Sequence, residues 1–253
     1  MKYNVSAVSF SNSIPFVYGL MHSDIFHEID LSLDTPSECG NKLINKEADI
    51  GEVPVAAIPD IPNAQIITNY CIGAGHHVKT VVFVSNVKHN KLKRIYLDDE
   101  SMTSNWLARI FACKFWNIDV EFKKQKVNDI NKLISDDAGA ILIGDKVFQI
   151  KENQYAYQYD LAEEWKKYTG LPFVFACWVT NRPLENKWIE RFNNALQKGL
   201  DNIDKAINMN QFTRKHYNDI FKYLTQNISF TFDDNKKKAM ELFLQYKKEI
   251  SNY

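Results

Sequence analysis

Two apolar runs constrain the fold of this chain more than any other feature. They cover residues 78–84 and 171–179, and both are rich in β-branched and aromatic side chains. Runs of this kind are typical of strands that are buried on both faces of a sheet. Shorter strand-like runs alternate with helix-like segments along the rest of the chain. The sequence therefore predicts an α/β fold.

Helix caps and periodicity predict the remaining elements. Thr35-Pro-Ser-Glu38 has the pattern of a capping box with proline at the first helical position. A second helix is expected over residues 160–168, capped by Asp160 and stopped by Gly170. Apolar residues recur at helical spacing in most of the chain after residue 184. The other expected elements are strands at 4–10, 49–58 and 140–143 and a helix that begins near residue 16.

The two long strands bracket a middle segment that has its own strands and helices. A chain that leaves one lobe, builds a second and returns needs two crossings, so we expect two α/β lobes. We expect lobe 1 to comprise residues 1–85 and 180–253, and lobe 2 to comprise residues 86–179. A ligand cleft between the lobes is expected, since domain interfaces are favoured ligand sites.

Composition narrows the class of protein. The 253 residues carry 31 basic and 31 acidic side chains. Because there is no excess of basic residues, the charge does not indicate a nucleic acid or a membrane as partner. The four cysteines are widely spaced, which predicts free thiols and no metal site. No apolar run approaches the about 20 residues of a membrane span, and the first residues do not resemble a signal peptide. We therefore expect a cytoplasmic protein without a cofactor, of unknown oligomeric state.

The segment 97–111 is the most informative for function. A short apolar run ends in acidic residues, and an amphipathic helical pattern begins after four polar residues, Ser101, Thr103, Ser104 and Asn105. A helix N-terminus offers unpaired N–H groups and a positive dipole end, which suit a carboxylate or a phosphate. The same residue types are also ordinary N-caps. From this segment alone, a plain helix cap is favoured over an anion site.

Six segments in order carry a family resemblance. They are Ser9-Phe-Ser-Asn-Ser-Ile-Pro-Phe16, Ala48-Asp-Ile-Gly-Glu-Val-Pro-Val55, Val78-Lys-Thr-Val-Val-Phe-Val-Ser85, Leu97 to Leu107, Ile143-Gly-Asp145 and residues 160–178. Together they resemble the chorismate dehydratases of the futalosine route to menaquinone. That family is similar to type-2 periplasmic binding proteins that became cytoplasmic enzymes. With this resemblance, the anion-binding interpretation of segment 97–111 is favoured.

The resemblance implies a lyase that removes water from chorismate to give 3-[(1-carboxyvinyl)oxy]benzoate. The substrate is a small dicarboxylate, and the reaction needs positioning rather than a metal or a covalent nucleophile. Asn12 and Thr80 are the implied catalytic residues. The implied substrate-binding residues are Ser11, Ser101, Thr103, Ser104, Asn105, Gly144, Asp145 and Phe175.

Three departures from the family pattern stand out. Thr80 replaces a serine, Phe10-Ser11 replaces Tyr-Leu, and Glu52 replaces an apolar residue. No Glu or His presents itself as the base, and one hypothesis from the family is that the substrate's own enolpyruvyl carboxylate takes the ring proton. His76-His77 is a possible alternative base, although a solvent-facing loop pair is favoured.

Ordinary structural roles remain open for several of these residues. Asn12 fits an Asx turn before Pro15, Thr80 fits a plain strand position, and Asp145 fits a helix cap better than a base. Phe175 is more typical of a core than of a substrate platform. Two alternative functions also remain: a two-lobed binding protein for a small aromatic or cyclic carboxylate, and the sister enzyme of the pathway. The sister enzyme opens with a Ser-Pro-Cys-Pro-Asn-Asp-like motif, which residues 11–15 do not match.

Overall fold

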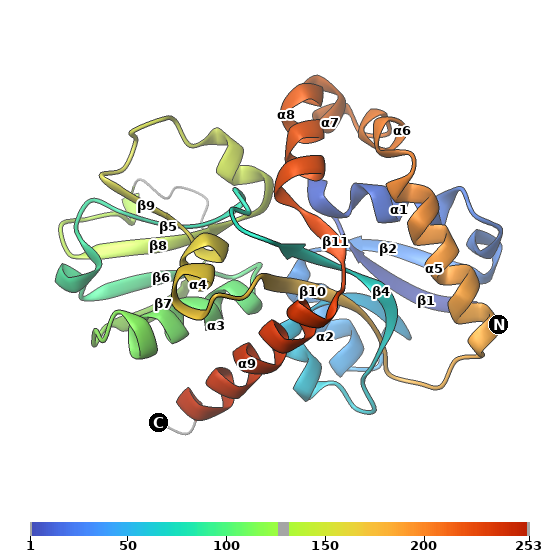
Figure 1. The fold of residues 1–253 in the computed structure, drawn as a ribbon, viewed down its shortest axis with the longest axis horizontal. Coiled ribbons are helices and arrows are strands. Elements are labelled where there is room, and N and C mark those ends of the chain that lie inside the picture. The colour runs from blue at the N-terminus through green and yellow to red at the C-terminus, as the bar shows by residue number, and fades with distance from the viewer. Residues whose placement is uncertain (1, 126–131, 252–253) are drawn as a thin grey trace. The chain divides into compact units, whose positions relative to one another are not determined.

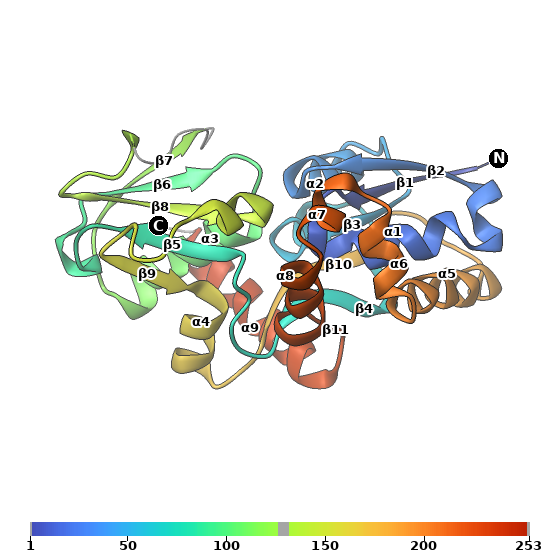
Figure 2. The same cartoon turned by 90° about the horizontal axis from the view of Figure 1, so that it is seen from above.

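The computed structural model of the chain describes residues 2–125 and 132–251. The chain divides into two compact units (Figures 1 and 2). Unit 1 comprises Met1–Gly73 and Val174–Asp233, and unit 2 comprises Ala74–Phe173 and Asp234–Tyr253. Each unit is built on its own mixed sheet with helices against it, which confirms the expected α/β class.

The sheet of unit 1 has six strands in the order β11-β4-β10-β3-β1-β2. Their bounds are β1 Tyr3–Val8, β2 Ile29–Asp34, β3 Ile50–Pro54, β4 Gln65–Ala74, β10 Phe173–Thr180 and β11 Ser229–Thr231. β1 runs parallel to β2 and β3, whereas β10 runs antiparallel to β3. The carboxyl ends of β1 and β3 therefore meet at the same edge of this sheet as the amino end of β10.

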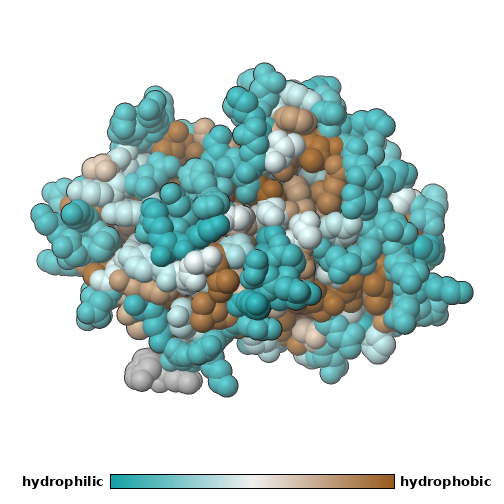
Figure 3. Space-filling model, in the orientation of Figure 1, coloured by the Kyte–Doolittle hydropathy of each residue, from teal (hydrophilic) through white to brown (hydrophobic). Residues whose placement is uncertain are grey.

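The helices of unit 1 are α1 Ile14–Met21, α2 Pro36–Ile44, α5 Asn186–Leu200, α6 Ile203–Asn208, α7 Gln211–Lys215 and α8 Tyr217–Lys222. α1 and α5 pack side by side (Figure 1). Two glycines allow this approach: a Cβ on Gly19 would lie 2.0 Å from the Ala195 carbonyl oxygen, and one on Gly199 would lie 1.7 Å from that of Pro15. The space-filling view shows mostly hydrophilic residues over α5, α7 and α8 (Figure 3), as expected for helices that bury only one face.

The sheet of unit 2 has five strands in the order β7-β6-β8-β5-β9. Their bounds are β5 Val81–Ser85, β6 Arg94–Asp98, β7 Glu121–Gln125, β8 Ala138–Ile143 and β9 Tyr157–Asp160. β5 and β8 are buried along their whole length, as strands in the middle of a covered sheet must be. The helices of this unit are α3 Thr103–Ile110, α4 Leu161–Thr169 and α9 Asp234–Ile250.

The boundaries between the units differ from the expected ones. The sequence assigned the run 78–84 to lobe 1 and the run 171–179 to lobe 2. In the structure β5 pairs with β8 and β9 in the sheet of unit 2, and β10 pairs with β3 in the sheet of unit 1. The last helix, α9, returns to unit 2, where Phe243 packs edge-on against Phe173 at 5.4 Å. Strand pairing and helix packing are non-local, so hydropathy identified the strands but not their sheets.

The expected caps are confirmed. The Thr35 hydroxyl accepts from the Glu38 backbone N–H, and the Thr35 N–H donates to the Glu38 carboxylate at 2.7 Å. Asp160 caps α4, and Gly170 ends this helix with a φ of +74°. Several expected strands are shorter than predicted. The strand expected at 78–84 begins only at Val81, as β5, so Thr80 precedes the strand and does not lie in it. β1 stops at Val8 before a 3-10 turn at Ser11–Ser13, and β3 stops at Pro54 before another 3-10 segment.

The cysteines are free thiols, as expected, but Cys113 is exposed whereas Cys39, Cys71 and Cys177 are buried. None of the helices in residues 2–125 and 132–251 has the length and apolar character that a bilayer crossing requires.

Candidate functional site

In unit 1 the predicted site residues gather at one edge of the sheet. Ser11 and Asn12 lie in the 3-10 turn that follows β1, with Ser11 buried and Asn12 half-buried. Phe175 lies next to Ala176, whose register partner is Pro54 at the carboxyl end of β3. The turn and the start of β10 therefore share the edge where the parallel strands end, which is where α/β proteins bind ligands.

Glu52 lies at the same edge, although its sequence context indicated no functional role. It lies on β3 with a fully buried side chain. Its Oε2 accepts from the Val8 N–H at 3.0 Å, and its Oε1 accepts from the Ser13 hydroxyl at 2.9 Å. Burial raises the pKa of the Glu52 carboxyl to about 7, although both hydrogen bonds act in the opposite direction. The one sequence signal was an acid within an apolar motif.

In unit 2 the predicted residues also share one sheet edge. β6 and β8 are parallel, so the segments after Asp98 and after Ile143 leave the sheet on the same side. β5 is antiparallel to β8, with Val81 opposite Ile143, so Thr80 lies at that edge as well. The structure thus brings together Thr80, Ser101, Thr103, Ser104, Asn105, Gly144 and Asp145.

A backbone hydrogen bond ties two of these segments directly. The Gly144 N–H donates to the Thr80 carbonyl oxygen at 2.9 Å. Gly144 has a φ of +70°, a left-handed conformation that favours glycine, and it starts the 3-10 turn that contains Asp145. Thr80 is buried, with 2% of its surface exposed. The bond therefore fixes Gly144 beside Thr80.

The 98–105 loop joins β6 to α3 and combines a cap with a polar lining. The Ser101 hydroxyl oxygen accepts from the Ser104 N–H at 3.1 Å, so Ser101, one residue before the N-cap Met102, satisfies a backbone donor in the first turn of α3. Thr103 and Ser104 form the first turn of this helix, and both are buried. The helix start was thus predicted correctly, and its first turn has the polar side chains that the anion hypothesis requires.

Asn105 has a different role from the expected one. Its Nδ2 donates to the carbonyl oxygens of Asp98 at 2.7 Å and Ser101 at 2.6 Å. Because both amide protons are used within the loop, Asn105 has no donor left for a carboxylate. Its amide holds the loop in shape, so the role of this side chain is structural.

An ion-pair cluster holds the same loop against the segment that follows β8. Lys146, three residues after Ile143, contacts Asp98 at 2.6 Å and Glu100 at 2.9 Å. Burial raises the pKa of Asp98, and Lys146 offsets this only in part. Burial also acts to lower the pKa of Lys146, but its two carboxylate partners raise it overall, so it remains a cation. Two acidic partners neutralise Lys146, which makes it a structural group rather than a free anchor for an anion.

Asp160 fixes the backbone just before Thr80. Its Oδ2 accepts from the Lys79 N–H at 2.6 Å, and its Oδ1 accepts from the N–H groups of Ala162 and Glu163. Lys79 has a φ of +72°, a conformation that a non-glycine residue holds only when its surroundings enforce it. The cap of α4 therefore also sets the entry into β5.

The histidine pair is divided between two structural partners. His77 Nδ1 lies 2.9 Å from Asp160 Oδ2, with 55% of the His77 side chain exposed. His76 Nε2 accepts from Lys166 Nζ at 3.0 Å. These contacts favour the loop-pair interpretation over a histidine base.

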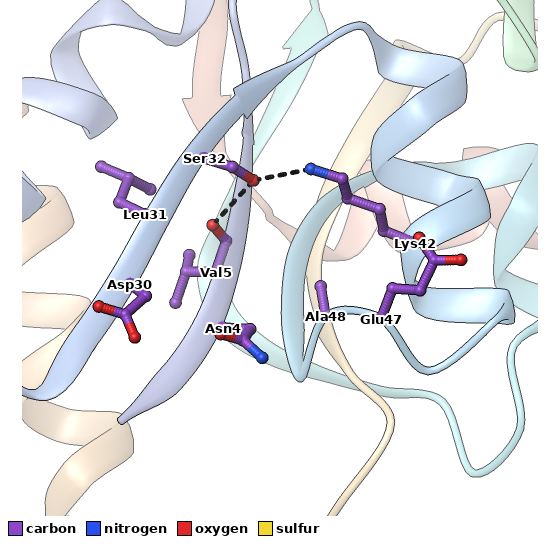
Figure 4. Close-up of a pocket in the computed structure, with 8 residues that line it drawn as sticks. All are labelled: Asn4, Val5, Asp30, Leu31, Ser32, Lys42, Glu47 and Ala48. Atoms are coloured by element: carbon purple, nitrogen blue, oxygen red, sulfur yellow. Dashed lines mark hydrogen bonds between the residues drawn. The ribbon is translucent and has the colours of Figure 1, made fainter. Parts of the chain in front are cut away.

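A separate pocket of about 400 Å³ lies on unit 1 (Figure 4). Its lining comes from the early part of β1, from β2 and α2, and from the turn before β3, including Asn4, Ser32 and Glu47. Lys42 Nζ donates to Ser32 Oγ at 3.1 Å at its side. The pocket therefore belongs to the amino end of β1 and β3, opposite to the edge that carries Asn12.

Comparison with protein families decides the family. A family model described as menaquinone biosynthesis matches residues 3–249, almost the whole chain. The chain belongs to the menaquinone biosynthesis family. Membership links this protein to an enzymatic pathway and agrees with the coarser part of the resemblance in its sequence motifs.

Solved structures similar to this menaquinone biosynthesis family protein share its fold. A protein from Archaeoglobus fulgidus matches with a TM-score of 0.79 at 16% identity, covering 100% of this chain and 98% of that one. The periplasmic aliphatic sulphonate binding protein of Escherichia coli matches with a TM-score of 0.63 at 13% identity, covering 99% and 92%. An ABC transporter protein from Parabacteroides distasonis matches with a TM-score of 0.61 at 17% identity, covering 98% and 92%. The fold is therefore that of a periplasmic binding protein, as expected.

Proposed function

We propose that this member of the menaquinone biosynthesis family is a chorismate dehydratase. The observation that carries the proposal is the cluster of Thr80, Ser101, Thr103, Ser104 and Gly144 at one edge of the unit 2 sheet. Hydroxyls and backbone N–H groups at a helix start suit a carboxylate ligand. The sequence motifs that contain these residues resemble the dehydratases segment by segment.

In this proposal the protein acts mainly by positioning. The hydrogen on the ether-bearing ring carbon and the neighbouring hydroxyl leave chorismate together as water, and the ring becomes aromatic. Aromatisation provides the driving force, so holding both carboxylates and the ring in one geometry is the main requirement, and such positioning can remove several kcal/mol from a barrier. The hydroxyls of unit 2 would hold one carboxylate, and Thr80 would donate to the same substrate.

Asn12 is proposed to bind the substrate through its amide. Among the residues that the structure describes, no hydrogen bond engages Asn12 Nδ2, while Asn12 Oδ1 accepts from the Ser13 hydroxyl at 3.2 Å. An amide nitrogen held in this way is a donor for a carboxylate or for the leaving hydroxyl. Ser11 and Phe175 at the same edge would contact the substrate as well, and its own enolpyruvyl carboxylate remains our proposed base.

The test is incubation of the purified protein with chorismate. A loss of one water by mass and the ultraviolet absorbance of an enolpyruvyl benzoate are expected, and Asn12→Ala should reduce kcat/KM by about 100-fold if its amide acts in the transition state. Glu47→Gln, an exposed change at the other end of β3, is the matched control. Unchanged chorismate that binds would favour the non-catalytic binding protein. Unchanged chorismate that does not bind would favour the sister enzyme of the pathway. A cytoplasmic location remains a prediction.

A further inference from the structure

Glu52 is a carboxyl that lies buried in an apolar part of unit 1. The strand that contains it is buried at every position. Trp178 is its register partner on β10 and is fully buried, as is Phe16, which packs against Trp178 at 6.1 Å between ring centroids. Among the ion pairs of the described residues, none includes Glu52. A carboxyl in such an apolar setting is strongly disfavoured as an anion.

The contacts of Glu52 lead directly to Asn12. Ser13 Oγ lies 2.9 Å from Glu52 Oε1 and 3.2 Å from Asn12 Oδ1. A serine hydroxyl has one proton, so Ser13 donates to one of these two oxygens at a time. Which oxygen receives it depends on whether Glu52 carries a proton of its own.

With Glu52 protonated, the chain of hydrogen bonds has one direction. Glu52 donates to Ser13 Oγ, Ser13 donates to Asn12 Oδ1, and both protons of Asn12 Nδ2 are left for a ligand. With Glu52 ionised, Ser13 donates to the carboxylate, and the Asn12 amide satisfies Ser13 best by turning over so that Nδ2 donates to Oγ. Asn12 Oδ1 would then face the ligand, and an oxygen repels a carboxylate.

We propose that Glu52 is a positioning residue, a proton-bearing carboxyl that orients Asn12 through Ser13 for an anionic ligand. This inference rests on the proposed function only in taking a carboxylate as the ligand of Asn12. It also makes ligand binding dependent on pH, because only one protonation state of Glu52 presents the donor.

The neighbouring titratable groups leave Glu52 as the group that changes near neutral pH. The charge of Glu52 acts on the thiols of Cys39 on α2 and Cys177 on β10. Burial raises the pKa of both thiols, so they stay neutral. Burial acts to raise the pKa of Asp34 at the end of β2, but hydrogen bonds from Lys42, Ser32 and Ser6 lower it overall. Asp34 therefore stays ionised beside Lys42, at 2.6 Å.

The test measures binding of the proposed product, 3-[(1-carboxyvinyl)oxy]benzoate, which keeps both carboxylates and is not turned over. Calorimetry between pH 6 and pH 9 compares the wild type with Glu52→Gln, Ser13→Ala and the Glu47→Gln control. Because the pKa of Glu52 is raised to about 7, its protonated fraction falls to about 1% at pH 9, and the wild-type Kd should rise by up to about 100-fold. Glu52→Gln keeps a donor toward Ser13, so its Kd at pH 6 should lie within about threefold of the wild type and stay flat with pH. Ser13→Ala should bind about tenfold more weakly at every pH, also without a pH dependence.

Proton uptake separates this inference from the proposed function. Calorimetry at pH 8 in buffers of different ionisation enthalpy should show the wild type and the Glu47→Gln control taking up close to one proton on binding, and Glu52→Gln taking up none. Wild type that binds the product with the same pH profile as Glu52→Gln would overturn the role of Glu52. Wild type that neither converts chorismate nor binds this product would instead overturn the proposed function. In that case carboxyl ¹³C NMR decides the inference: a Glu52 signal that titrates near 7 supports a proton-bearing carboxyl, and one that titrates near 4.5 overturns it.

Discussion

The carboxylate of Asp160 holds the backbone N–H of Lys79 at 2.6 Å, while Lys79 keeps a φ of +72°. This bond joins the start of α4 to the residue before Thr80, so a helix cap and a proposed ligand contact depend on one side chain. Asp160→Ala should lower the free energy of unfolding by about 2 kcal/mol, because the N–H groups at the start of α4 and the partly buried N–H of Lys79 lose their acceptor. Urea unfolding measures this change.

The same variant should also raise KM for chorismate, because Thr80 loses its fixed entry. Lys79→Gly is the matched control, since glycine adopts a positive φ without strain and keeps the N–H for Asp160. A stable Lys79→Gly protein with wild-type KM, beside an Asp160→Ala protein with raised KM, is the expected pair. Equal KM values for all three proteins would contradict the positioning role of Asp160.

His77 should add a pH-dependent term to stability. The hydrogen bond to Asp160 raises the pKa of His77, against a smaller opposing effect of burial. Its contribution is therefore fully present below the unfolded pKa of about 6.5 and is lost as the pH rises through the higher folded value. Because 55% of the side chain is exposed, we expect less than about 1 kcal/mol. In urea unfolding, His77→Ala should be less stable than the wild type at pH 5.5 and nearly equal to it at pH 8.5. The same difference in stability at both pH values would contradict this prediction.

Glu52 should make the free energy of unfolding depend on pH, as a buried carboxyl without an ion-pair partner does. Its folded pKa of about 7 lies above the unfolded value, so the folded state binds a proton more tightly, and stability falls as the pH rises from about 4.5 to 7. Glu52→Gln removes this loss, and its advantage over the wild type should be about 2 kcal/mol larger at pH 8 than at pH 5. Parallel unfolding curves against pH would show that Glu52 stays ionised in the fold. No ligand is needed for this measurement.

Thr80 tests the departure from the serine of the resembled family. Thr80→Ser keeps the hydroxyl and removes a methyl, so kcat/KM for chorismate should change by less than about tenfold. Thr80→Val keeps the shape and removes the hydroxyl, so kcat/KM should fall by about 10- to 100-fold if the hydroxyl contacts the substrate. Steady-state kinetics distinguish the two. A Thr80→Val enzyme as active as Thr80→Ser would make Thr80 a residue before β5 without a role in the reaction.

Asn105 should matter for stability more than for contact with the ligand. Asn105→Asp sets a carboxylate oxygen against two carbonyl oxygens, so the free energy of unfolding should fall by about 3 kcal/mol. Asn181 is a matched control in unit 1, because its Nδ2 also bridges two carbonyl oxygens, those of Leu43 and Ala48. Asn105→Ala and Asn181→Ala should be destabilised to a similar extent, but only Asn105→Ala should alter KM, through the 98–105 loop. An Asn105→Ala protein as stable as the wild type would contradict this account.

Local signals in the sequence determined the elements of this protein. The capping box at Thr35, the cap and stop around Asp160 and Gly170, and the buried strands near 78 and 171 each depend on neighbours a few residues away, so the sequence alone predicted them. The order of family-like motifs also predicted the family.

Tertiary structure decided what depends on distant pairing. β5 and β10 entered the opposite sheets to those expected, because strand pairing is set by packing across the whole unit. The roles of Glu52 and Asn105 could not be predicted for the same reason. The hydrogen-bond partners of a buried polar group lie on other segments of the chain, and local hydropathy does not identify them.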